Sequence, residues 1–146
     1  MPRRRSSAAP TPASPPERWI KTGVELYEGA PQLSTVATDR WADWSIGPLD
    51  PAPAPGSSDG VTIEIVREGD ENGKSAWVYR RGGGGDRSKK VPLREICWIF
   101  ADERDGAPGG PDEWILEVSP LVARPEKSAS APLEVRFSEF KVEFDA

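Results

Sequence analysis

Apolar and polar residues alternate along most of the chain, which is the pattern of β-strands that bury one face. Within residues 19–27, for example, Val24 and Leu26 fall on one face, whereas Lys21 and Glu25 fall on the other. No apolar repeat of helical period persists over several turns anywhere in the sequence. The alternation predicts short strands at 19–27, 32–38, 41–49, 61–68, 74–81, 93–101, 114–118 and 133–144.

Turn signals separate these runs. A turn at 28–31 predicts one hairpin, and the pair Asn72-Gly73 predicts a second, tighter one. Two stretches rich in proline and glycine, 47–60 and 102–112, predict long loops. Many short strands joined by turns and long loops indicate an all-β, antiparallel sandwich or barrel.

Two of the runs depart from simple alternation. Residues 93–101 are apolar on both faces, which predicts a central strand covered on both sides, with Cys97 as a small buried residue. In residues 133–144 the apolar side chains change from odd to even positions. A bulge or corner near Ser138-Glu139 is therefore expected, because one strand cannot keep both sets on one face.

The N-terminal residues differ in composition from the rest. Residues 1–16 are rich in proline, arginine and serine and contain no apolar run, which predicts a disordered tail followed by one sandwich domain at 17–146. The arginines at positions 3–5 suit a nuclear or anionic-surface tag, or simply the solvated start of a tail. The prolines argue against the amphipathic helix of a mitochondrial presequence.

Charge and rare residues exclude several classes of function. The formal net charge is −5, and the acidic excess lies in the body of the chain, so nucleic acid is not an expected partner. The sequence has no histidine and one cysteine, Cys97. Catalysis by a histidine base, metal sites, cofactors and an internal disulfide are therefore not expected. No run approaches transmembrane length, so we expect no membrane partner and a cytoplasmic location, with the nucleus as the alternative.

The aromatic residues raise the question of carbohydrate binding. Tryptophan and tyrosine rings could form a stacking platform for sugars, or they could simply fill the core. Trp77 and Tyr79 share one strand face, and Trp19 shares a face with the charged residues Lys21 and Glu25, which predicts partial exposure of Trp19. The residues expected to bind a ligand are Trp19, Lys21, Glu25, Trp41, Asp43 and Trp44.

Paired carboxylates are the remaining route to catalysis. Glycoside hydrolysis with retention requires two carboxyl groups roughly 5 Å apart. Glu25 and Asp43 are the candidates for such a pair, but no closely spaced Glu-x-Asp-x-x-Glu signature occurs. We therefore assign no catalytic residue from the sequence.

Several segments together resemble the regulation-of-enolase protein family. They are residues 19–25 (WIKTGVE), 28–38 (EGAPQLSTVAT) and 42–45 (ADWS), with later strand segments in the same order. The resemblance implies a concanavalin A-like lectin/glucanase jelly roll and no general catalytic site. The family has further strands before the first motif, where this chain has its tail. The sandwich is therefore expected to be incomplete, with open sheet edges through which the chain could associate with itself.

Three functional hypotheses follow. The first is a non-catalytic binding or regulatory module with a protein partner or an oligosaccharide against its sheet face. The second is a carbohydrate hydrolase that uses Glu25 and Asp43. The third is a truncated chain that has no independent function.

Overall fold

The structure is a computed structural model in which the chain forms two compact units, residues 1–103 and 104–146. The residues that the structure describes are 18–39, 41–54, 57, 59–68, 75–82, 88–100, 116–125 and 132–144.

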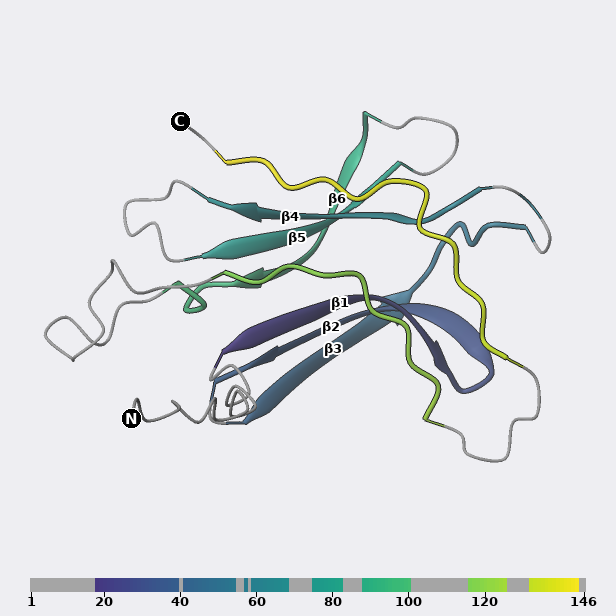
Figure 1. Cartoon of the computed structure of the whole chain (residues 1–146), viewed down its shortest axis with the longest axis horizontal. Helices are drawn as coiled ribbons and strands as arrows, with labels where there is room; N and C mark the ends of the chain where they lie inside the picture. The colour runs from purple at the N-terminus through teal and green to yellow at the C-terminus, as the bar shows by residue number, and fades with distance from the viewer. Residues whose placement is uncertain are drawn as a thin grey trace, which may run out of the picture. The chain divides into compact units, whose positions relative to one another are not determined.

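Among its described residues, the first unit contains two antiparallel sheets of three strands each, drawn as two layers in Figure 1. In both sheets the strands follow one another in chain order, so the second strand of each is central. The prediction of an all-β antiparallel sandwich is confirmed. The first sheet consists of β1 (Trp19–Tyr27), β2 (Ala30–Thr38) and β3 (Ala42–Pro48). The second sheet consists of β4 (Thr62–Arg67), β5 (Ala76–Arg81) and β6 (Lys90–Ile96).

A two-residue turn sets the register of the first hairpin. Tyr27 pairs with Ala30, and the two residues between them, Glu28 and Gly29, have φ angles of 50° and 77°. Positive φ at both central positions is the type I′ geometry, whose twist matches that of the flanking strands. Gly29 adopts it without steric cost. The turn predicted at 28–31 is therefore confirmed, and β2 begins two residues before the predicted strand.

The core lies between the two sheets. Alternate residues of β2 and β5 face inward, and Ala37, Ala76 and Val78 have no exposed surface. Ile96 at the end of β6 and Ile99 just beyond it complete the buried cluster. Burying one face of each sheet against the other is the contribution that holds a sandwich together.

Two arginines tie the layers and loops together. Arg94 of β6 forms an ion pair with the carboxylate of Asp43 on β3, which links the second sheet to the first. Arg80 of β5 is buried, and its two terminal nitrogens donate hydrogen bonds to the carbonyl oxygens of Asp50 (2.7 Å) and Pro51 (2.6 Å). These two hydrogen bonds hold Asp50 and Pro51, which follow β3, against Arg80 of β5.

The prediction of a central strand at 93–101 is wrong. The strand β6 lies at an edge of the second sheet and ends at Ile96, and the four residues after it form turns. Pro92 suits an edge position because proline has no N–H to donate to a further strand. The turns place Ile99 in the core, whereas Cys97 is exposed, so its predicted burial is also wrong. A continuous apolar run does not distinguish a buried strand from a turn that buries only some of its residues.

Residues 116–125 and 132–144 of the second unit carry no strand, so the strands predicted at 114–118 and 133–144 are not formed in the described part of that unit. A strand needs a ladder of hydrogen bonds to a neighbour, and apolar alternation alone does not supply one. The chain does bend at Ser138, where the phase of the apolar residues changes.

Some predictions concern residues outside the described ranges. These are the disordered tail at 1–16, the turn at Asn72-Gly73 and the loop at 102–112. The strands on either side of that turn do pair, since β4 and β5 form an antiparallel hairpin. Among the described residues there is no helix with the length and apolar character needed to cross a membrane.

Candidate functional site

The candidate site is the outer face of the first sheet, the side that points away from the second sheet. In the antiparallel register Lys21 of β1 lies opposite Val36 of β2, which in turn lies opposite Trp44 of β3. Residues directly opposite share a face, so Lys21 and Trp44 lie on the same side. Ala37, which is in the core, follows Val36 directly on β2 and therefore points to the other side. We call this side of the first sheet the outer surface; among its side chains are Trp19, Lys21, Glu25, Tyr27, Ser34 and Trp44.

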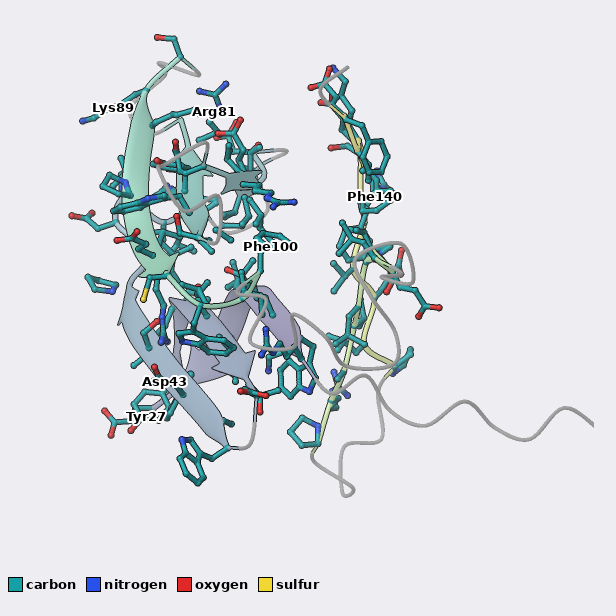
Figure 2. The ribbon with its side chains drawn as sticks, turned by 90° about the vertical axis from the view of Figure 1, so that its left-hand side faces the viewer. Tyr27, Asp43, Arg81, Lys89, Phe100 and Phe140 are labelled. Carbon is teal, nitrogen blue, oxygen red and sulfur yellow. The ribbon has the colours of Figure 1, made fainter. Side chains whose placement is uncertain are left out.

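Three aromatic rings give the outer surface its apolar character. Trp19, Tyr27 and Trp44 are 40%, 42% and 48% exposed. The rings of Tyr27 and Trp44 meet edge to face, with centroids 5.4 Å apart and planes at 75°. Figure 2 shows Tyr27 at the periphery of the first sheet. The predicted partial exposure of Trp19 is confirmed, and these rings present apolar area to solvent instead of filling the core.

A polar network runs between the rings. The indole N–H of Trp44 donates a hydrogen bond to the Ser34 hydroxyl at 2.9 Å, which fixes the orientation of the indole. Lys21 donates to the carboxylate of Glu25 and forms an ion pair with it. The hydrogen bond from Lys21 lowers the pKa of Glu25, burial opposes this, and hydrogen bonds with Ser34 and Trp44 lower it further. The net pKa is below the ordinary value, so Glu25 is anionic at neutral pH.

Glu25 and Asp43 do not form a carboxylate pair. Glu25 lies opposite Gln32 on β2, whereas Asp43 lies opposite Ala37. Gln32 and Ala37 are five residues apart on one strand, an odd separation that puts them on opposite faces. Asp43 is instead held by Arg94 on the core side of the sheet. Two carboxyl groups on opposite faces cannot act on one glycosidic bond.

The structure thus brings together four of the six residues predicted to bind a ligand. Trp19, Lys21, Glu25 and Trp44 share the outer surface. Asp43 faces the other way, and Trp41 is an exposed residue just before β3 begins.

Two members of the outer surface, Tyr27 and Ser34, were not predicted from the sequence. Tyr27 lies two residues after Glu25 in the predicted strand 19–27, so strand alternation puts both on one face. This signal would have identified Tyr27. Ser34 has no sequence signal, because its role depends on the position of the Trp44 indole across the sheet.

The outer face of the second sheet also carries aromatic residues. Trp77 and Tyr79 are stacked, with ring centroids 5.9 Å apart and planes at 20°, which confirms that they share a face. The ammonium group of Lys90 lies 4.8 Å from the centre of the Tyr79 ring. Glu64 pairs with both Lys90 (3.0 Å) and Arg81 (3.4 Å). On this face Lys90 therefore contacts both the Tyr79 ring and the carboxylate of Glu64.

A cavity of about 300 Å³ opens between the sheets near the start of β6. Its walls are mainly apolar, with Leu33 and Leu93 among them, and Arg80 is its buried cation. Both terminal nitrogens of Arg80 already donate to backbone carbonyls, so the arginine acts in holding the loop. Within the described ranges, no group of three or more Cys, Asp or Glu side chains is placed to hold a metal ion.

Residues 13–144 match the family described as protein of unknown function, DUF1349. The chain belongs to this family. It is also similar to an uncharacterized protein of Emericella nidulans, with 40% identity over 126 residues, which are 86% of this chain and 52% of that protein. The chain therefore spans about half the length of this curated relative. No solved structure matches the chain.

Proposed function

We propose that this DUF1349 member is a non-catalytic binding module whose outer surface binds an oligosaccharide. The observation that carries the proposal is the gathering of Trp19, Tyr27 and Trp44 on one solvent-facing sheet surface. Sugar rings have apolar C–H faces that stack on exposed aromatic rings, and their hydroxyl groups need polar partners beside those rings. Lys21 and Glu25 supply a donor and an acceptor on the same surface.

The arrangement of the outer surface favours recognition over catalysis. Its one carboxylate, Glu25, is engaged by Lys21 and has a lowered pKa, so it is suited to accept hydrogen bonds and not to act as a general acid at neutral pH. The second carboxylate of the hydrolase hypothesis, Asp43, lies on the opposite face. The geometry therefore supports binding without bond cleavage.

The resemblance of residues 19–25 to the regulation-of-enolase family leads us to infer that the sandwich is of the concanavalin A-like jelly-roll type. Two stacked antiparallel sheets support this inference. We also propose a cytoplasmic or nuclear location, because the thiol of Cys97 is exposed and free, as suits a reducing compartment. A protein partner on the outer surface is the competing occupant that the experiment below must distinguish.

The test is thermal unfolding of the full chain, followed by tryptophan fluorescence, with a panel of neutral and acidic oligosaccharides. A ligand that binds only the folded state raises the unfolding temperature, and titration calorimetry then gives its Kd. Trp44→Ala should weaken binding at least about fivefold, because aromatic anchors commonly contribute more than about 1 kcal/mol. Ser34→Ala should cause a smaller loss, since the indole stays but its hydrogen-bond acceptor is removed.

The matched control is Trp77→Ala, which removes an aromatic residue from the outer face of the other sheet. It should leave the Kd unchanged within about twofold. An equal loss in Trp44→Ala and Trp77→Ala would contradict the assignment of the outer surface. If no oligosaccharide raises the unfolding temperature, the proposal of a sugar ligand is wrong and a protein partner becomes the better account.

A further inference from the structure

The strand β1 is an edge strand of the first sheet. Among the described residues it pairs only with β2, and its nine residues contain no proline and no register shift. An edge strand of this length presents a row of backbone N–H and C=O groups that can accept another strand. Of the other edge strands, β6 contains Pro92, β3 ends in Pro48, and β4 is shorter than β1, with six residues against nine.

The sequence of β1 is self-complementary about its central residue, Gly23. Lys21 and Glu25 lie two residues on either side of Gly23, and Trp19 and Tyr27 lie four residues on either side. We propose that β1 pairs antiparallel with β1 of a second copy of the chain, about a two-fold axis at Gly23. The β1–β3 sheets of the two copies then form one continuous sheet. Both copies contribute the same residues to the contact, which is therefore isologous, as in closed dimers.

Charge selects this register and direction. About the two-fold axis, Lys21 lies opposite the partner's Glu25, and Glu25 opposite the partner's Lys21. Directly opposite residues on antiparallel strands have Cα atoms about 4.5–5.5 Å apart. Within one chain Lys21 and Glu25 are separated by four residues of strand, about 13 Å at roughly 3.3 Å each, and their side chains must bend over Gly23 to meet. A parallel, in-register pair would instead place like charges side by side.

The apolar residues of β1 fit the same register. On the core side, Val24 and Leu26 are exposed (46% and 77%), although they share a face with residues that are buried elsewhere in the sheet. In the dimer Leu26 lies opposite the partner's Ile20, so this uncovered apolar area gains a neighbour. On the outer surface Trp19 lies opposite the partner's Tyr27, which extends the row of aromatic rings across the dimer.

The test is sedimentation velocity of the full chain over a range of concentrations, without any ligand, so that its result does not depend on the proposed sugar binding. The wild-type chain should dimerise. Lys21→Glu and Glu25→Lys should each raise the dimer Kd by at least about tenfold, because each reversal creates two like-charge contacts. The double variant Lys21→Glu/Glu25→Lys restores both opposite-charge pairs and should recover the wild-type Kd within about threefold.

The control is Lys89→Glu, which reverses the charge of an exposed lysine just before β6 and should leave the dimer Kd unchanged. Hydrogen exchange of the wild-type chain gives a second readout that needs no variant. Amides of β1 on its open edge should become more protected as concentration rises, whereas the edge amides of β6 should not. A monomer at all concentrations, or a double variant no better than the single ones, would overturn the proposal.

Discussion

The clearest quantitative prediction concerns Ile96, which is 1% exposed and is the largest fully buried side chain in the part of the chain that the structure describes. It packs with Ala37, Ala76, Val78 and Ile99, which come from both sheets and from the turn after β6. Ile96→Ala removes three carbon atoms, worth about 2.4 kcal/mol at roughly 0.8 kcal/mol per buried group. The cavity left behind adds to this, so the free energy of unfolding should fall by about 2–5 kcal/mol.

The assay is urea unfolding of the full chain followed by intrinsic tryptophan fluorescence. Small domains have a total stability of roughly 5–15 kcal/mol, so Ile96→Ala should lower the urea midpoint substantially. The matched control is Leu26→Ala at low protein concentration, because Leu26 is an apolar side chain that is 77% exposed. It should cost less than about 0.5 kcal/mol. If the two variants cost the same, the core does not lie between the sheets as described.

Two further predictions concern single side chains. The hydrogen bond with Lys21 lowers the pKa of Glu25 in the folded chain. The charged form of Glu25 therefore stabilises the fold above the unfolded-state pKa of about 4.3. This stabilisation is lost as pH falls through the lower folded-state pKa. The stability difference between wild type and Glu25→Gln should therefore shrink between pH 6 and pH 3, roughly the window around that pKa; a constant difference would count against the Lys21 contact. Cys97 is exposed, so it should react with a thiol reagent in the native chain; reaction only after denaturation would contradict the position of the turn.

The hairpins β1–β2 and β4–β5 could be predicted from the sequence because their signals are local. Alternation in residues 19–27 and the turn at Glu28-Gly29 fix which residues share a face and where the chain reverses. The same is true of β4 and β5, whose alternation holds even though the turn between them lies outside the described ranges. These strands needed no information from distant parts of the chain.

The errors arose where the outcome depends on distant partners. Residues 93–101 are apolar throughout, and only the end of the pairing between β5 and β6 at Ile96 decides that Cys97 turns outward. In residues 133–144 the alternation is clear, but alternation does not specify a neighbour with which to form a ladder.

In the candidate site, too, the features set within one strand could be predicted, and those set by neighbouring strands could not. Trp19, Lys21 and Glu25 could be placed on one face because they occupy alternate positions of a single strand. Placing Asp43 required the register between β2 and β3, which no local pattern specifies, and this register puts Asp43 on the face opposite Glu25. The hydrogen bond between Trp44 and Ser34 likewise joins residues of neighbouring strands and could not be read from spacing.

The most direct test of the proposed binding surface is the two-dimensional NMR spectrum of the tryptophan indole N–H groups during titration with the best oligosaccharide from the panel. If the outer surface binds the oligosaccharide, the signals of Trp19 and Trp44 shift together, with one Kd, while those of Trp77 and Trp98 do not move. Shifts at Trp77 with none at Trp44 would place the ligand on the second sheet and contradict binding at the outer surface.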